Sequence, residues 1–429
     1  MRSYLLVAAC LALAVACGGK KTGAGAGSGE VVGSAPANPA SGSGGSGSAA
    51  VTTTTPPSPP PAATGSAGSG CTPPEDITAD YTITKGCSVK PEGNLNIDDK
   101  ATLTVEAGAK IAFAKEKRIE VHGKLVIAGT ADAQVVLTSA DSSPNPGDWE
   151  GVIFFDTTKD GTSIDHARVE YAGQNGSFGD SAIHFYGDVP PNRVSITNSE
   201  IVKSTGGGIS IDKVKSSPKA LSGNKFDADD KICISAPADV WGAIGSNTCG
   251  SMLAHVNEGN LTKTATWPTI DSPYVIDENF DIGGTGDAPI LTLPTGAKIE
   301  MKDKHYFRIG SGDGGGLVAK NVTFTSAAVT PDSGDWEGLV IEDKATGTTI
   351  DGCVVEYAGG DGSYGKSPIV ITADVDKIAK RVAITHVTLK SSNANNGIDS
   401  KDNQCGPYGD ATAGNKMEGS GAGSAGLCH

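Results

Sequence analysis

The sequence predicts an all-β protein in which one unit has been duplicated in tandem. Gly supplies 59 of the 429 residues and aromatic residues only 5%, which is unlike the composition of a helical bundle. Apolar residues alternate with a period of two over short stretches bounded by Gly, Asp, Asn and Ser, a pattern typical of short strands. Several short motifs recur after about 187 residues, which indicates an internal repeat.

The N-terminus carries an export signal. Arg2 precedes an apolar run from Tyr4 to Val15 that is too short to span a bilayer. The small residues before Cys17 resemble the lipobox of bacterial lipoproteins, which implies removal of residues 1–16 and attachment of lipid to Cys17, and so a membrane anchor without a membrane-spanning helix. The absence of Asp after this Cys implies, through the same resemblance, the outer membrane, with the protein facing the periplasm or the cell surface. An ordinary signal peptide is the alternative.

The residues that follow are predicted to form a disordered tether. Residues 18–70 consist almost entirely of Gly, Ser, Ala, Thr and Pro, so they cannot bury a core. With the lipidated Cys17 they make a tether, residues 17–70, that would hold the folded part on the order of 40 Å from the membrane.

The duplication is visible in four pairs of motifs that keep their order along the chain. We expect the first copy to span residues 71–262 and the second copy residues 263–429, including a C-terminal cap. The pairs are Ala107–Ile111 with Thr295–Ile299, Gly147–Gly151 with Gly334–Gly338, Gly161–Asp165 with Gly347–Asp351, and Val169–Gly173 with Val355–Gly359.

Comparison of the copies predicts which strand face points inward. Positions that stay apolar in both copies belong to the core, and these include Val152 and Phe154, which become Leu339 and Ile341. The next residue, Phe155, becomes Glu342 and should therefore point outward. Strands of three to five residues with almost no helical patterning leave few all-β architectures open, and a sandwich would need longer strands and hairpin turns.

The motif series resembles bacterial right-handed parallel β-helix repeat proteins of the pectate-lyase-like superfamily. It consists of Tyr274–Ile276, Leu291–Ile299, Val322–Ser326, Gly334–Gly338 and Val354–Gly359, with Leu103–Ile111 as the first-copy counterpart of the second stretch. The resemblance covers most of residues 80–390 and implies a right-handed parallel β-helix, in which inward side chains stack from rung to rung. It leaves function open, because this superfamily includes polysaccharide lyases, phage tailspikes and adhesins.

Seven cysteines remain after the leader is removed and Cys17 is lipidated, an odd count for an exported protein. The sequence-local pairs are Cys71 with Cys87, Cys233 with Cys249 and Cys405 with Cys428, at the start, the junction and the end of the predicted β-helix. Cys353 aligns with Ala167 and keeps the phase of inward residues, so we expect a buried free thiol. A metal site is the competing interpretation, but neither CxxC nor HExxH occurs.

Acidic residues repeated in both copies are expected to be structural and not catalytic. These are Asp148, Glu150, Asp156 and Glu170, with Asp335, Glu337, Asp343 and Glu356 in the second copy. No Arg or Lys aligns with the base of the polyuronate lyases, so an enzyme is less favoured than a non-enzyme and no catalytic residue is assigned. Gly310–Gly315 satisfies GxGxxG, but strand-patterned residues follow it, which predicts a turn and not a dinucleotide site. No cofactor is expected; this loop could hold Ca²⁺ through carboxylate and carbonyl oxygens.

Two equivalent loops are the candidates for ligand binding. Each places one aromatic residue, Phe178 or Tyr364, among Gly, Ser, Asn and Asp, with Asn175 and Asp361 nearby. A ring flanked by amides and carboxylates suits a sugar, although the rings could instead fold back over a neighbouring rung. The histidines show no nucleophile or ligand spacing and are expected at the surface: His122, His166, His184, His255, His305 and His386.

The charge balance restricts the partners. The net charge is −15 for the chain and −17 for residues 71–429, which disfavours nucleic acids. The sequence therefore predicts a lipid-anchored envelope protein that displays a β-helix as a structural or binding module for a polysaccharide or another surface protein. The alternative is a polysaccharide lyase or glycoside hydrolase acting on an extracellular or envelope polysaccharide.

Overall fold

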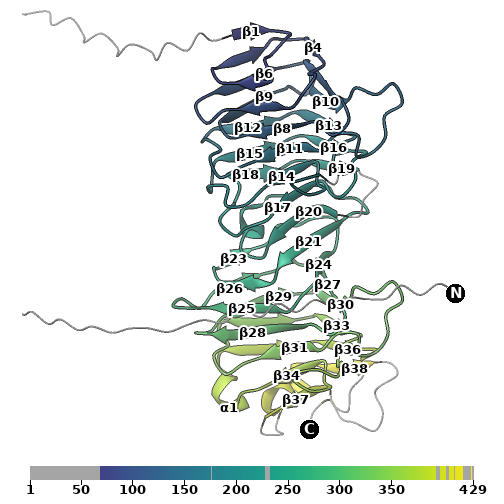
Figure 1. Cartoon of the computed structure of the whole chain (residues 1–429). Coiled ribbons are helices and arrows are strands. Elements are labelled where there is room, and N and C mark those ends of the chain that lie inside the picture. The colour runs from purple at the N-terminus through teal and green to yellow at the C-terminus, as the bar shows by residue number, and fades with distance from the viewer. Residues whose placement is uncertain are drawn as a thin grey trace, which may run out of the picture. The chain divides into compact units, whose positions relative to one another are not determined.

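The computed structural model describes residues 68–174, 176–227, 232–392, 397–401, 405–409, 411–418 and Leu427. They all belong to one compact unit, built of short parallel strands that stack rung upon rung (Figure 1). This arrangement is a parallel β-helix, so the predicted all-β fold is confirmed. Asn175, Cys428 and the predicted leader and tether lie outside the described residues.

One long sheet runs through both copies of the repeat (Figure 1). We call it the long sheet. Its strands are, in spatial order, β2 (Asp76–Ile77), β5 (Leu95–Ile97), β8 (Arg118–Val121), β11 (Gly151–Phe154), β14 (Ile183–Phe185), β17 (Ile209–Ile211), β20 (Ile232–Pro237), β21 (Leu253–Glu258), β24 (Tyr274–Ile276), β27 (Lys298–Met301), β30 (Thr323–Ser326), β33 (Val354–Glu356), β36 (Thr388–Lys390) and β38 (Lys416–Glu418).

Two sheets accompany the long sheet in the first copy. One contains β1 (Gly68–Gly70), β3 (Tyr81–Ile83), β6 (Thr102–Glu106), β9 (Lys124–Ala128), β12 (Thr162–Asp165), β15 (Val194–Thr197) and β18 (Ala220–Ser222). The other contains β4 (Ser88–Val89), β7 (Lys110–Phe113), β10 (Val135–Ser139), β13 (Ala167–Glu170), β16 (Glu200–Val202) and β19 (Lys225–Asp227).

Two further sheets accompany the long sheet in the second copy. One contains β22 (Asn260–Leu261), β25 (Phe280–Gly284), β28 (Tyr306–Gly312), β31 (Gly338–Ile341), β34 (Ile369–Ile371) and β37 (Ile398–Ser400), and the other β23 (Ala265–Thr266), β26 (Ile290–Thr292), β29 (Gly316–Lys320), β32 (Thr348–Asp351) and β35 (Val382–Thr385). The described helical segments are short: α1 (Val375–Ile378), η1 (Trp241–Ala243), η2 (Gly406–Tyr408) and η3 (Ala411–Ala413). None of the described helices is long and apolar enough to cross a membrane.

The core consists of columns of side chains. Each column is formed by side chains that point inward from equivalent strand positions in successive rungs. In β11, for example, Val152 and Phe154 are fully buried and face the same side as their register partners Ile183 and Phe185 in β14. In-register stacking puts like side chains above one another, and each interior strand has both edges hydrogen-bonded. The inward face predicted from the sequence comparison is therefore correct.

The repeated Gly-Asp-Trp-Glu-Gly motif has a structural role in both copies. The Trp149 ring is buried and its Nε1–H donates to the Glu170 carbonyl at 2.9 Å, just as Trp336 donates to Glu356 at 2.9 Å. Asp148 accepts a 2.7 Å hydrogen bond from Ser139 and one from the Asn145 N–H. Asp148 therefore holds the turn before β11, a structural role in line with its recurrence.

Different strands of the repeated unit form the long sheet in the two copies, and the change occurs at the junction between them. Through the first copy the long sheet contains β11, whose sequence repeat is β31, yet in the second copy it contains β30 and β33, which repeat β10 and β13. The loop of Phe178 therefore leads into the long sheet at β14, whereas the loop of Tyr364 leads out of it after β33. Because the strands are parallel, the two loops lie at opposite strand ends of the long sheet. The loop of Phe178 lies where the strands begin, and the loop of Tyr364 lies where they finish.

Two of the predicted disulfides are present among the described residues. Cys71 bonds to Cys87 and Cys233 to Cys249, and the second bridge links β20 to the segment before β21. Cys405 is also disulfide-bonded, while its predicted partner Cys428 lies outside the described residues. Cys353 is a free, fully buried cysteine, in agreement with its predicted inward position. Burial, the main cause, raises the pKa of its thiol to about 11.

Candidate functional site

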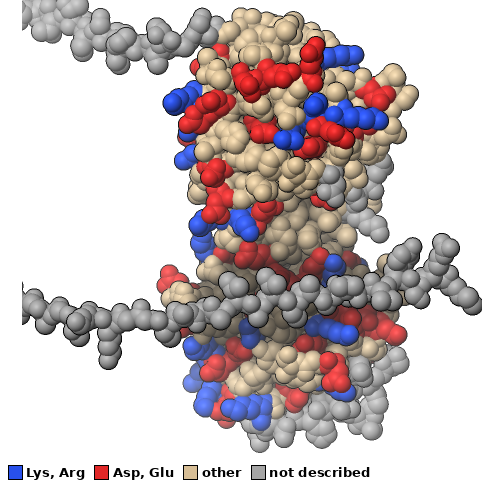
Figure 2. Space-filling model, in the orientation of Figure 1, with Lys and Arg blue, Asp and Glu red and all other residues tan. Residues whose placement is uncertain are grey.

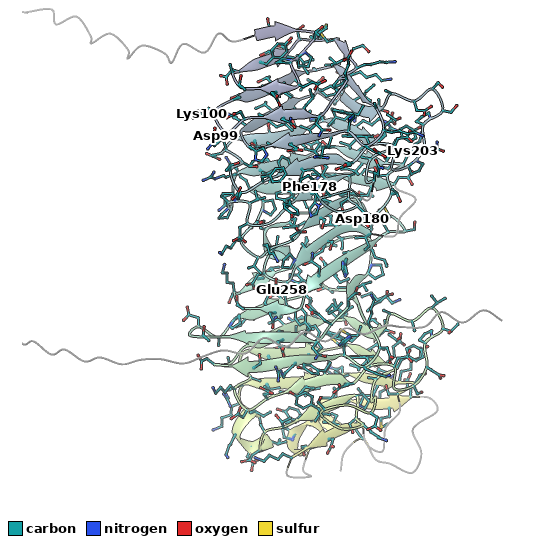
Figure 3. All side chains as sticks on the ribbon, in the orientation of Figure 1. Asp99, Lys100, Phe178, Asp180, Lys203 and Glu258 are labelled. Carbon is teal, nitrogen blue, oxygen red and sulfur yellow. A yellow bond between two sulfur atoms is a disulfide. The ribbon has the colours of Figure 1, made fainter. Side chains whose placement is uncertain are left out.

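The outer face of the first copy carries a cluster of aromatic side chains over β8, β11 and β14. We call it the aromatic shelf: His122, Phe155, Phe178, His184 and Tyr186. His122, Phe155 and Tyr186 each follow the last inward residue of their strand, so they form one outward column. Phe178 comes from the loop between β13 and β14 and lies over the strand face in Figure 3.

The rings of the shelf contact one another in a continuous series. His122 stacks on Phe155 with ring centroids 4.3 Å apart. Phe178 meets Phe155 at 5.2 Å and Tyr186 at 5.0 Å, both edge to face. The Arg118 guanidinium lies 4.9 Å from the centre of the Phe178 ring. The Phe178 ring therefore folds back over the rungs, as the second interpretation of its loop expected, and it also helps to build an aromatic surface. Sugar binding by this loop stays a prediction.

One member of the shelf is buried and anchors it. His184 is 7% exposed, so the expectation that it lies at the surface is wrong; the Gly179 backbone and the Tyr186 ring cover it. Its Nε2 lies 2.7 Å from Asp212 Oδ1. Burial would raise the pKa of Asp212, but the hydrogen bond and charge of His184 outweigh that effect and lower it. Tyr186, in contrast, is 41% exposed and available to a ligand.

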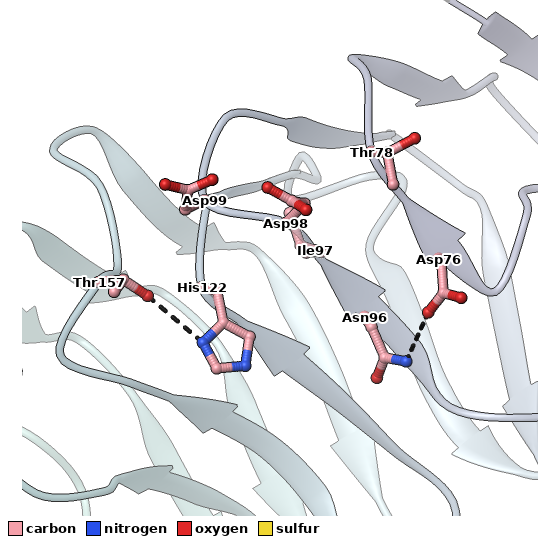
Figure 4. A pocket seen from close by; sticks show the side chains of 8 residues that line it. All are labelled: Asp76, Thr78, Asn96, Ile97, Asp98, Asp99, His122 and Thr157. Carbon is pink, nitrogen blue, oxygen red and sulfur yellow. Dashed lines mark hydrogen bonds between the residues drawn. The ribbon is translucent and has the colours of Figure 1, made fainter.

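A pocket of about 480 Å³ adjoins the shelf at His122 (Figure 4). Its wall holds three carboxylates, Asp76, Asp98 and Asp99, together with Asn96 and Thr157. The Thr157 hydroxyl lies 3.3 Å from His122 Nδ1, and Asn96 donates to Asp76 at 2.9 Å. The main cause that lowers the pKa of Asp98 is a proton shared with the Asp99 carboxyl group, and the Lys100 N–H donates to Asp98 as well. At neutral pH this carboxylate is a hydrogen-bond acceptor.

The second copy has no equivalent of the shelf among its described residues. The sequence repeat puts Glu342 at the position of Phe155, and the register of β31 with β34 puts Thr372 at that of Tyr186. The ring of Tyr364 meets only Tyr306, at 5.2 Å, and its hydroxyl accepts a 2.7 Å hydrogen bond from Arg308. Asp361 is exposed and pairs with Lys366 at 3.2 Å. The shelf is therefore a feature of one copy.

Three arginines on the outer surface each lie between two carboxylates. Arg118 contacts Glu120 and Glu150, Arg168 contacts Glu170 and Glu200, and Arg308 contacts Asp281 and Glu342. Ion pairs of this kind recur along the rod, and Figure 2 shows acidic and basic side chains interspersed on the visible face. An arginine held in this way is a poor base, because its carboxylate partners stabilise the charged form.

Within Gly310–Gly315, residues 310–312 form the end of β28 and only residues 313–315 make the turn into β29, so a strand and not a helix follows, as predicted. Asp313 accepts a 2.9 Å hydrogen bond from the Gly286 N–H and lies 3.6 Å from Lys344. The Lys344 ammonium also donates to the Gly312 carbonyl at 2.6 Å. Within the described residues, no group of three or more His, Cys, Asp or Glu side chains is placed to hold a metal ion.

The stacked parallel rungs define this chain as a parallel β-helix protein. Residues 75–181 match the model of the pectate-lyase like β-helix domain, in agreement with the resemblance found in the sequence. The matched region contains His122, Phe155 and Phe178 and the whole acidic pocket. Comparison with curated proteins and with solved structures gave no match.

Proposed function

We propose that this protein is a carbohydrate-binding β-helix whose ligand lies on the aromatic shelf and in the adjoining acidic pocket. Sugar rings pack their apolar faces on aromatic side chains, and their hydroxyls require nearby acceptors and donors. The shelf supplies Tyr186 and Phe155, and the pocket supplies Asp98, Asp99 and Asn96. His122 belongs to both, so one ligand can contact the two parts together.

The observation that carries this proposal is the restriction of the shelf to one copy. The elements that the fold needs, such as Trp149 and Asp148, recur as Trp336 and Asp335 with the same hydrogen bonds. The shelf does not recur, and the second copy folds into the same rungs without it. The second copy therefore shows that the rungs form without an exposed ring at the position of Tyr186, so the fold does not require this ring.

Asp98 in the pocket is suited to bind hydroxyls and not to act as a catalytic acid. A glycosidase needs a carboxylic acid with a raised pKa to protonate the leaving oxygen. The pKa of Asp98 is lowered, so this side chain accepts hydrogen bonds from hydroxyls and does not act as the acid. Three carboxylates at one pocket also disfavour a polyanionic sugar and favour a neutral or cationic one.

Polysaccharide cleavage is the second candidate, and one observation favours it. Burial, the main cause, raises the pKa of Glu342, although its neighbour Arg308 partly opposes the shift. Asp281 lies on the other side of Arg308 at 2.5 Å. A carboxyl group with a raised pKa beside a second carboxylate is the pairing that glycoside hydrolysis uses, so Glu342→Gln tests this reaction separately from the shelf.

We place this activity at the cell envelope. The apolar leader and the lipobox-like residues before Cys17 support a lipid anchor, and residues 18–70 support a tether. The partners are then a membrane, through the lipid, and a polysaccharide or another surface protein.

The test is a screen of the full chain against neutral, cationic and anionic polysaccharides, with and without Ca²⁺, that records binding and chain cleavage. Tyr186→Ala should weaken binding at least tenfold, since stacking one sugar on one ring contributes about 1.5 kcal/mol or more. Tyr364→Ala is the control, because it also removes a tyrosine ring but from the second copy, in the loop that repeats the loop of Phe178. Equal binding by the wild type and Tyr186→Ala would refute the proposal, and chain cleavage lost in Glu342→Gln would favour the enzyme.

A further inference from the structure

Three polar side chains on the outer face of the long sheet form a series near the junction of the copies. Ser235 in β20 is the register partner of His255 in β21. Its Oγ lies 2.9 Å from His255 Nδ1. On the other side of the ring, His255 Nε2 lies 3.0 Å from Oδ2 of Asp277, which follows β24. A hydroxyl, an imidazole and a carboxylate are thus arranged in a line across three rungs.

The neighbours of Ser235 fix the direction of the hydrogen bonds. Asn257 donates from Nδ2 to Ser235 Oγ at 3.0 Å, so the hydroxyl oxygen already accepts and its own hydrogen can point to His255. His255 Nδ1 then receives this hydrogen on its lone pair, and Nε2 carries the ring proton toward Asp277. This is the tautomer that a general base for a serine hydroxyl requires.

The carboxylate end of the series stays charged. Burial would raise the pKa of Asp277, but the close contacts and charges of His255 and Lys302 outweigh this and lower it. Lys302 Nζ lies 2.6 Å from the same Oδ2 that faces His255. An ionised Asp277 orients the imidazole and stabilises the imidazolium that forms when Ser235 gives up its proton.

The series is more than a generic polar column on the sheet. His255 Nε2 is buried and its 3.0 Å contact with Asp277 is poorly aligned for a hydrogen bond, and Asp277 Oδ1 is buried without a partner. Buried polar atoms that lack partners cost stability. Ser210 in β17 is the adjacent serine in the same outward column, and its register partner His184 directs Nε2 to Asp212 instead. Only the Ser235 hydroxyl is coupled to an imidazole in this column.

We infer that Ser235 is a nucleophile for acyl esters, with His255 as its general base and Asp277 as the positioning carboxylate. Ser235 Oγ attacks the ester carbonyl carbon while its proton passes to His255 Nδ1. The bond to the alcohol oxygen then breaks, and the alcohol leaves with that proton. Water attacks the acyl-serine, giving a proton to Nδ1, and Ser235 regains it as the carboxylic acid departs. The half-buried Ser235 suits small acyl groups such as acetate, including those carried on a polysaccharide hydroxyl.

A fluorophosphonate probe and p-nitrophenyl acetate test this inference on the full chain. Peptide mapping of the labelled wild type should find the probe on Ser235, a readout that needs no variant. Ser235→Ala and His255→Gln should each lower ester hydrolysis on the order of 100-fold or more, the size of a general-base contribution. Ser210→Ala should keep the wild-type rate. Thermal melts of each variant confirm that it is folded.

A comparison of kcat with KM tests the positioning role of Asp277. Asp277→Asn should lower kcat for the ester and slow the labelling of Ser235 while KM stays near the wild-type value, because the imidazolium that forms at His255 loses its carboxylate. Absence of label from Ser235 in the wild type would overturn the inference. So would a His255→Gln variant that is folded and hydrolyses the ester at the wild-type rate.

Discussion

His122 and Phe155 stack face to face on the outer surface of adjacent strands, with ring centroids 4.3 Å apart and an interplanar angle of 16°. The stack joins the acidic pocket to the exposed Tyr186. In the second copy the corresponding positions are Gly310 and Glu342, so no stack can form there. Duplication has preserved the rungs while the outer faces have diverged, and we locate the function on the face that differs.

The lipid anchor is tested by Cys17→Ser. Without the thiol no thioether to diacylglycerol can form, so the variant should move from the detergent phase to the aqueous phase in a partitioning assay. A single lipid-bearing residue is the only anchor that we propose, so the shift should be close to complete. A variant that fractionates with membranes as the wild type does would show that the lipoprotein assignment is wrong.

The buried Cys353 should tolerate replacement by Ala, the residue that the first copy has at this position, Ala167. The thiol makes only long contacts with the Ala319 and Asp351 carbonyls, at 3.4 and 3.5 Å. We expect Cys353→Ala to lower the free energy of unfolding by about 1 kcal/mol or less. Denaturant melts at neutral pH measure this, and a loss of several kcal/mol would contradict it.

The same residue should make stability depend on alkaline pH. The pKa of the folded thiol is raised to about 11 by burial, whereas an unfolded thiol ionises near pH 8.5. The neutral thiol therefore stabilises the folded state fully below about pH 8.5, and this contribution is lost as the pH rises toward 11. The difference in melting temperature between the wild type and Cys353→Ala should shrink or reverse over this range. If the melting temperatures of the two proteins change with pH in the same way, the Cys353 thiol is not shielded from water and the prediction is wrong.

Each observed disulfide should contribute similarly to stability. Cys71–Cys87 and Cys233–Cys249 both join residues that are 16 apart in sequence. Closing a loop of this length restricts the unfolded chain and so raises the free energy of unfolding by about 3 kcal/mol. Double Ser variants of each pair should lose about this amount in denaturant melts. The second pair lies where the long sheet passes from one copy to the other, so its removal should also expose this junction to protease. Loss of neither stability nor protection would contradict this role.

The fold could be predicted from the sequence because the duplication reports which positions must stay apolar. Val152 and Phe154 keep their character in Leu339 and Ile341, while Phe155 does not, and this separates inward from outward residues. The local disulfide pairs could be predicted for a similar reason, since neighbouring rungs bring residues of short separation together.

The site was harder to predict, because its members come from different rungs. Phe154–Phe155 and Phe185–Tyr186 each pair an inward ring with an outward one, and this repeated pattern was the available signal. His122 could not be recognised as part of the shelf until the register of β8 with β11 placed it beside Phe155. The two aromatic loops lie at opposite strand ends because the long sheet takes different strands of the repeat in the two copies. No sequence motif indicates this change.

The most direct test of the central claim is titration of the full chain with a polysaccharide selected in the screen, comparing the wild type with Tyr186→Ala and Tyr364→Ala by calorimetry. Tyr186 is 41% exposed, so the truncated protein should stay folded, which a thermal melt of each variant checks. We predict that Tyr186→Ala weakens binding at least tenfold while Tyr364→Ala binds as the wild type does. Equal affinity of the wild type and a folded Tyr186→Ala variant would contradict the assignment of the ligand to the aromatic shelf.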